Sequence, residues 1–161
     1  MRVFLPATLP MLAVLQDSGR LEAVDGIGYA VTPTLREWYA VGDAEELDYA
    51  ALADAARASL RLLAADPGAP CRRVVIAVDV PDATPDMAAG RTVVRLVSPV
   101  GLEQVASVHV DNGDAEQTVR AAVGALDAAR AGDADAEAVV EEPEGFELLW
   151  FATQEIPELV D

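Results

Sequence analysis

Residues 32–66, TPTLREWYAVGDAEELDYAALADAARASLRLLAAD, decide the fold because they predict two consecutive helices with recognisable start and stop signals. Thr34 followed by Glu37 fits a capping box, in which a hydroxyl and a carboxylate satisfy backbone N–H groups of the first helical turn. Gly42 ends this short helix, because glycine adopts the left-handed C′ conformation without a steric cost. Asp43 opens a second helix as an N-cap, with its negative charge at the positive end of the macrodipole. We therefore expect a helix of about six residues followed by one of about twenty-two.

The longer helix carries one apolar face at the three- and four-residue spacing of a helix surface. Its members are Tyr49, Leu52, Ala53, Ala56, Leu60 and Leu63. Burial of the tyrosine and each leucine stabilises by ~1.5–3 kcal/mol, whereas the neighbouring Asp54–Arg57 pair adds at most ~0.5 kcal/mol. We therefore expect packing, and not charge, to hold this helix in place.

The composition predicts one globular domain that spans residues 1–161. The chain has 161 residues, of which 52% are hydrophobic and 24% are charged, so it can build a core of useful size. Its 28 acidic residues face 11 basic ones, all arginine, and the net charge is −17. This charge repels phosphate backbones and anionic lipid, so we expect neither nucleic acid nor a membrane surface as a partner.

The N-terminal segment and the cysteine content favour a cytoplasmic location. Pro6 and Pro10 interrupt the apolar run MRVFLPATLPMLAVL, which lacks a small-residue cleavage site and so does not read as a signal peptide. No apolar run is long enough to span a bilayer. Cys71 is the single cysteine, so no disulfide within the chain is expected.

The patterns on either side of this region predict further strands and helices. We expect strands over residues 2–5, 27–32, 73–80, 92–97, 105–111 and 146–153, and helices over residues 8–17 and after the turn at 112–113. The acidic stretch AGDADAEAVVEEPEG, at about residues 131–145, is expected to be a flexible loop. The order β-α-β-α-α-β-β-β-α-β predicts an α+β fold, a single-domain two-layer sandwich in which a mixed sheet of about six strands has helices packed mainly on one face.

Five segments resemble a family of uncharacterised small proteins from high-GC actinomycete bacteria. They are MRVFLPATL, AVTPTLREWY, ASLRLLAADP, SVHVDN and ELLWFATQEIP, spread over nearly the whole chain. The resemblance implies a single small domain and carries over no activity, ligand or site residue.

The residues of the three strands from 73 to 111 separate into two faces, because alternate side chains of a strand point in opposite directions. The face expected to form the core contains Val74, Ile76, Val78, Val80, Val94, Leu96, Val108 and Val110. The opposite face is half polar and contains Arg73, Val75, Ala77, Asp79, Arg91, Val93, Arg95, Ser107, His109 and Asp111. Such a face is exposed to solvent, covered by a second copy of the chain, or part of a ligand site.

His109 and Asp111 are the candidate site residues on the half-polar face. In one interpretation they form an acid/base pair, and Arg91, Arg95 or Arg73 holds an anionic group. In the other, which we favour, the strand is a surface strand with weak cross-strand ion pairs. The chain has no nucleophile elbow of the GxSxG type, so we assign no catalytic residue and do not expect an enzyme.

No metal or cofactor site is expected either. One histidine and one cysteine far apart make no zinc pattern. Asp133, Asp135 and Glu137 resemble the start of a calcium loop but lack its later glycine and glutamate. Gly26 and Gly28 are followed by a predicted strand and not by the helix that a dinucleotide fingerprint requires.

Arg36, Trp38 and Tyr39 form a polar and aromatic cluster of the kind enriched at protein interfaces. We therefore favour a non-enzymatic binding or protein-interaction module that forms a homodimer through this cluster or through the half-polar sheet face. The alternative is a small enzyme or anionic-ligand binder that uses His109, Asp111, Arg91 and Arg95 on an open sheet face. A third hypothesis is that the acidic surface itself binds a basic protein partner, an interaction that salt would weaken.

Overall fold

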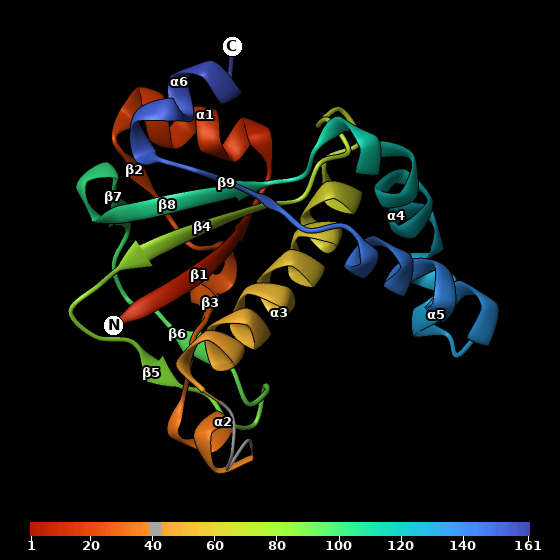
Figure 1. The fold of residues 1–161 in the computed structure, drawn as a ribbon, viewed down its shortest axis with the longest axis horizontal. Coiled ribbons are helices and arrows are strands. Elements are labelled where there is room, and N and C mark those ends of the chain that lie inside the picture. Colours follow the sequence, from red (N-terminus) through yellow and green to blue (C-terminus); the bar gives the residue numbers. More distant parts are fainter. Residues whose placement is uncertain (39–42) are drawn as a thin grey trace.

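The computed structural model of the protein describes residues 1–38 and 43–161 (Figure 1). Tyr39 and Gly42, which carried part of the interface prediction and the end of the first predicted helix, lie outside the described residues. Helix α2 (Pro33–Trp38) begins before Thr34, the predicted cap, because the cap is Thr32, whose hydroxyl oxygen accepts a hydrogen bond from the backbone N–H of Leu35 at 3.1 Å.

The predicted α+β class is confirmed. Within the described residues, seven strands form one sheet in the order β5-β6-β3-β1-β4-β8-β9. Their bounds are β1 (Arg2–Ala7), β3 (Ile27–Tyr29), β4 (Val74–Asp79), β5 (Thr84–Pro85), β6 (Val93–Arg95), β8 (Val105–Val110) and β9 (Leu149–Phe151). The short strands β2 (Arg20–Leu21) and β7 (Val100–Gly101) pair separately.

The strands are antiparallel at every described pairing. The prediction of a mixed sheet is therefore wrong. The reason is the position of β1. Strands β3 and β4 run in the same direction, as expected for strands joined through a long helix, but β1 lies between them and pairs antiparallel with both. Among the described strands, no two that run parallel are therefore neighbours.

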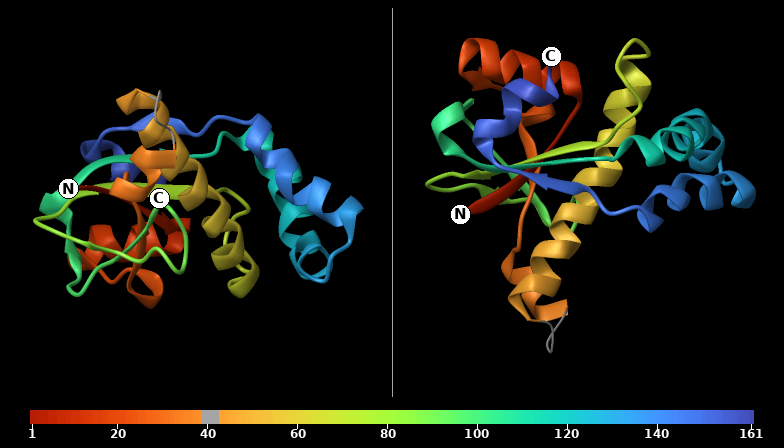
Figure 2. Two further views of the ribbon diagram at one scale, coloured as in Figure 1. Left: turned by 90° about the horizontal axis from the view of Figure 1, so that it is seen from below. Right: turned by 45° about the horizontal axis from the view of Figure 1, so that its top comes forward.

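Helices cover both faces of the sheet, which corrects the prediction that they lie mainly on one (Figure 2). Helices α1 (Leu9–Ser18) and α6 (Ile156–Leu159) lie on the face that contains Val74, Ile76 and Val78. Helix α3 (Ala44–Ala65) lies on the opposite face. Its small side chains allow this, because Ala51, Ala55 and Ala58 can approach the strands closely. They form one buried cluster with Phe4, Val75 and Ala77.

Ser59 joins α3 to two strands. Its hydroxyl donates a hydrogen bond to the carbonyl oxygen of Ala7 at 2.7 Å and accepts one from the backbone N–H of Val74 at 3.2 Å. The face that the sequence analysis described as half polar is therefore covered over β1, β3 and β4. Tyr49, predicted to be buried on α3, is instead 57% exposed.

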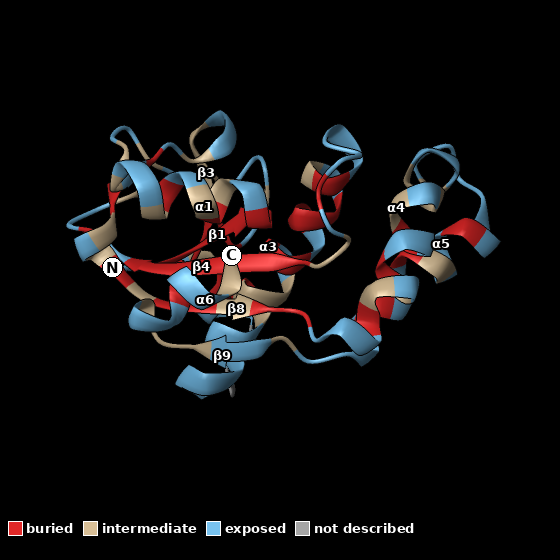
Figure 3. Cartoon of the chain, turned by 90° about the horizontal axis from the view of Figure 1, so that it is seen from above, coloured by how far each residue is buried: buried red, intermediate tan, exposed pale blue. Residues whose placement is uncertain are grey.

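The acidic stretch at 131–145 is not the predicted loop. It contains helix α5 (Ala134–Glu141) and a short 3₁₀ segment at 142–145, and α5 packs against α4 (Glu116–Arg130). The Asp133 carboxylate caps α5 by accepting hydrogen bonds from the backbone N–H groups of Asp135 and Ala136, and Ala136 and Val140 are buried. Helices α4 and α5 form an arm beside the sheet (Figure 3).

Candidate functional site

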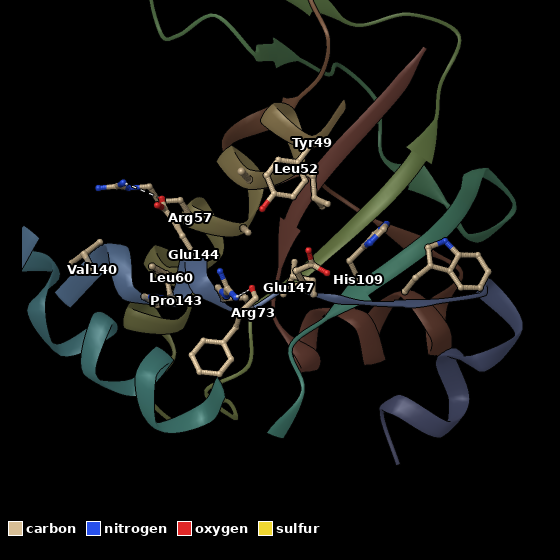
Figure 4. A pocket seen from close by; sticks show the side chains of 15 residues that line it. Tyr49, Leu52, Arg57, Leu60, Arg73, His109, Val140, Pro143, Glu144 and Glu147 are labelled. Carbon is tan, nitrogen blue, oxygen red and sulfur yellow. Dashed lines mark hydrogen bonds and ion pairs between the residues drawn. The ribbon is translucent and has the colours of Figure 1, made fainter. Parts of the chain in front are cut away.

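A cavity of about 490 Å³ opens between α3 and the chain that leads from α5 into β9 (Figure 4). One wall consists of side chains on α3, namely Tyr49, Leu52, Ala53, Ala56 and Leu60. The opposite wall comes from the C-terminal part of the chain and contains Val140, Pro143, Phe146, Leu148 and Trp150. We call this cavity the lateral groove.

The groove exists because α3 packs on two different structures. It lies against β1, β3 and β4 of the sheet and also contacts α4 of the arm, but it does not cover the edge formed by β8 and β9. His109 on β8 pairs directly with Trp150 on β9, so both side chains point to the same face of the sheet. These two residues therefore line the groove where α3 leaves the sheet uncovered.

Strand β9 lies at the edge of the sheet. This corrects the prediction that the last strand lies in the interior of the sheet. Within the described residues it pairs only with β8. Leu149 is 43% and Trp150 62% exposed. The apolar character on both faces of this strand, which suggested an interior position, instead reflects Trp150 at the groove and Phe151 packed against the core on the other face.

Asp111, a candidate for acid/base chemistry, is bound to Arg73. The Arg73 Nη2 atom lies 2.7 Å from Asp111 Oδ1 and Arg73 Nε lies 2.8 Å from Oδ2, and the two side chains are 4% and 0% exposed. Arg73 Nη2 also donates to the carbonyl oxygen of Phe146 at 3.1 Å. The pair therefore has a structural role, and Asp111 does not orient His109.

His109 is half-buried and its contacts are limited. Its Nε2 atom lies 3.1 Å from the Ser107 hydroxyl oxygen, and its ring meets Phe4 edge to face at 6.5 Å between centroids. Burial lowers the pKa of His109 below its usual value of 6.5, and the positive charge of Arg2 adds to this effect. The ring is therefore neutral at neutral pH.

The structure does not bring Arg91 and Arg95 to this site. Arg91 stacks over the Trp38 ring at 3.5 Å from the ring centroid, and Arg95 forms an ion pair with Asp86 at 2.9 Å. Arg95 belongs to β6, which strands β3, β1 and β4 separate from β8. Of the predicted ligand-binding residues, only His109 and Arg73 line the groove.

Arg36 and Trp38, the described members of the predicted interface cluster, do not line the groove. Arg36 and Trp38 are exposed on α2, and Trp38 contacts Arg91. The groove residues Glu144, Phe146, Glu147 and Leu148 were missed, because the sequence analysis assigned them to a loop and an interior strand. A local signal was present in the density of large apolar residues from 146 to 151.

Among residues 1–38 and 43–161, no group of three or more His, Cys, Asp or Glu side chains is arranged to hold a metal ion. In the same ranges no helix combines the length and the apolar character that crossing a bilayer requires.

The fold and the groove define an α+β protein with an antiparallel sheet and an apolar groove at one sheet edge. The chain belongs to the Family of unknown function (DUF6912), which matches residues 1–160. This confirms the resemblance to a family without an assigned activity. No curated protein and no solved structure matches the chain.

Proposed function

We propose that the protein is a non-enzymatic binding module whose lateral groove accepts an apolar ligand. The observation that carries this proposal is the groove itself, since ten of its lining residues are the apolar or aromatic side chains described above. Its volume of about 490 Å³ falls in the range of ligand sites. The bound molecule would remove these side chains from water, which is the main source of affinity at such a site.

The polar groups of the groove support binding better than catalysis. Arg73 and Asp111 neutralise each other, and His109 contacts a serine that is itself 5% exposed and does not line the groove. A general base needs a substrate proton within reach and an oriented ring. The separation of Arg91 and Arg95 from His109 likewise argues against the anionic-ligand alternative.

The test uses Trp150 as a reporter. Trp38→Phe leaves Trp150 as the single tryptophan, because the chain has two. We expect titration with the neutral apolar dye Nile red to change the Trp150 emission in a saturable way. Failure of the dye to saturate would contradict the proposal.

A matched pair of substitutions on α3 locates the binding. Ala53→Phe places a ring in the groove and should weaken dye binding about tenfold or more, whereas Ala64→Phe on the exposed part of the same helix should not. Equal binding by both variants would place the dye elsewhere and would count against the groove.

A homodimer through β9 is a second candidate. It is supported by the position of β9 at the sheet edge and by the exposure of Leu149 and Trp150. Because the chain carries a net charge of −17, dimer formation should increase with salt. Light scattering over a concentration series tests this, with Leu149→Lys expected to give a monomer. A monomer at every concentration and salt would exclude the dimer.

A cytoplasmic location is part of the proposal. It is supported by the single cysteine, Cys71, which is partly exposed and has no partner in the chain for a disulfide.

A further inference from the structure

The charged side chains that line the lateral groove leave one charge uncompensated. Arg73 is neutralised by Asp111 at 2.7 Å, and Arg57 forms an ion pair with Glu144 at 3.6 Å. Glu147 also lines the groove and, over the ranges that the structure describes, takes part in no ion pair. The groove therefore combines an apolar interior with one free negative charge.

The position of Glu147 suits a ligand with two parts. Its side chain is directed from the segment before β9 toward α3, among the apolar lining residues (Figure 4). The neighbouring residues Phe146 and Leu148 also line the groove, so apolar atoms adjoin the carboxylate on its own segment. A molecule with a positive headgroup and an apolar body would meet a partner for each part.

The aromatic residues at the groove favour a cation as well. Tyr49 is 57% and Trp150 62% exposed, so their rings remain accessible from the groove. The face of an aromatic ring attracts an ammonium group through its quadrupole. His109 does not oppose this attraction, since burial keeps its ring neutral at neutral pH.

An anionic headgroup would be disfavoured at the same place. It would lie near the Glu147 carboxylate in a molecule whose net charge is already −17. Arg73 does not offset this, because an anion bound to it would leave the buried Asp111 without its partner, and Arg57 already has the Glu144 carboxylate at 3.6 Å.

We propose that the lateral groove binds an amphiphilic amine, with the ammonium group at Glu147 and the apolar body between α3 and β9. This inference rests on the proposed function, because it names the class of ligand that the same groove takes. It assigns to Glu147 the role of the residue that selects the headgroup.

The experiment compares three ligands with the same alkyl chain, namely decylammonium, decanol and decanoate, each below the concentration at which it forms micelles. Binding is followed by Trp150 emission in the Trp38→Phe protein and by displacement of Nile red. We expect decylammonium to bind about tenfold more tightly than decanol, and decanoate to bind most weakly.

Two substitutions separate a specific contact from general attraction to an acidic protein. Glu147→Gln and Glu158→Gln each remove one negative charge, but Glu158 is exposed on α6 and does not line the groove. Glu147→Gln should abolish the preference of decylammonium over decanol, and Glu158→Gln should retain it. Thermal unfolding of both variants checks that they are folded.

The outcomes distinguish the two proposals. If decanol and decylammonium displace the dye equally, or if Glu147→Gln keeps the preference, the amine is the wrong class of ligand and the apolar groove still stands. If none of the three ligands displaces the dye and the dye itself does not saturate, both proposals fail.

Discussion

Arg73 and Asp111 form a buried ion pair that joins three parts of the chain. The pair links the start of β4 to the end of β8, since Asp111 Oδ2 also accepts a hydrogen bond from the Arg73 backbone N–H at 2.8 Å. Arg73 reaches the carbonyl oxygen of Phe146, and Arg72 Nε donates to the carbonyl oxygen of Asp111. The pair thus holds the segment that forms one wall of the lateral groove.

Removal of one partner of the Arg73–Asp111 pair should therefore destabilise the folded protein strongly. We expect Asp111→Ala to lower the free energy of unfolding by about 3–5 kcal/mol, because it leaves the buried Arg73 guanidinium without a counter-charge. Urea unfolding measures the change. Asp114→Ala, at an exposed position three residues away, should change it by about 0.5 kcal/mol or less. A loss below about 1 kcal/mol for Asp111→Ala would contradict the structural role of the pair.

Substitution by alanine at two glycines should change the free energy of unfolding in opposite directions. A Cβ atom at Gly28 would lie 2.4 Å from Val3 Cγ1 and 3.1 Å from Leu5 Cδ2, so Gly28→Ala should destabilise by about 1–3 kcal/mol through overpacking. Gly124, inside α4, has nothing within 4 Å of such an atom, and Gly124→Ala should stabilise by about 0.5–1 kcal/mol. Thermal or urea unfolding of both variants tests the two signs: a stabilising Gly28→Ala would refute the packing around Gly28, and a destabilising Gly124→Ala would refute the open space at Gly124.

His109 should make stability depend on pH. Its pKa is lowered in the folded protein, mainly by burial, so the unfolded chain binds the proton more readily. Its contribution is therefore complete above the unfolded pKa of about 6.5 and declines as the pH falls from there toward the lowered folded pKa.

The comparison that isolates this effect is between the protein and its His109→Asn variant. We expect the free energy of unfolding of the original protein to fall relative to that of the variant as the pH is lowered from about 8 to 5, because the variant lacks this titration. Identical pH profiles for the two proteins would show that His109 is exposed to water and not half-buried.

The cap of α5 should matter both for stability and for the groove. Asp133→Ala removes the acceptor for two backbone N–H groups and should cost about 1 kcal/mol. Because Val140 and Pro143 of this region form part of the groove wall, Nile red binding should weaken as well. Asp135→Ala, which removes charge from the same first turn but no cap, should have the smaller effect on both measurements.

Local signals in the sequence predicted the features that depend on neighbouring residues. The Asp43 cap of α3 is present, with its carboxylate accepting from the Glu46 backbone N–H at 2.9 Å, and α1 (Leu9–Ser18) lies within one residue of the predicted helix over residues 8–17. The alternation in β4 correctly separated Val74 and Ile76 from Val75, because strand periodicity alone determines which face a side chain occupies.

Features that depend on distant partners could not be predicted in the same way. The insertion of β1 between β3 and β4 leaves no local signature, and it is what makes the sheet antiparallel. The apolar spacing of Tyr49 and Leu52 is the same whether a helix faces a core or a groove, so the groove wall was interpreted as core. The Arg73–Asp111 contact required the register between β4 and β8.

The central place of β1 also constrains how the polypeptide is made. Arg2 pairs with Asp79, a separation of 77 residues, so β1 leaves the ribosome well before β4, one of its two neighbours. At about 5–20 residues per second this delay lasts roughly 4–15 seconds, during which Val3 and Leu5 lack their final cover. Such non-local pairing slows folding. The biosynthesis of this protein therefore includes an interval in which β1 is available to chaperones.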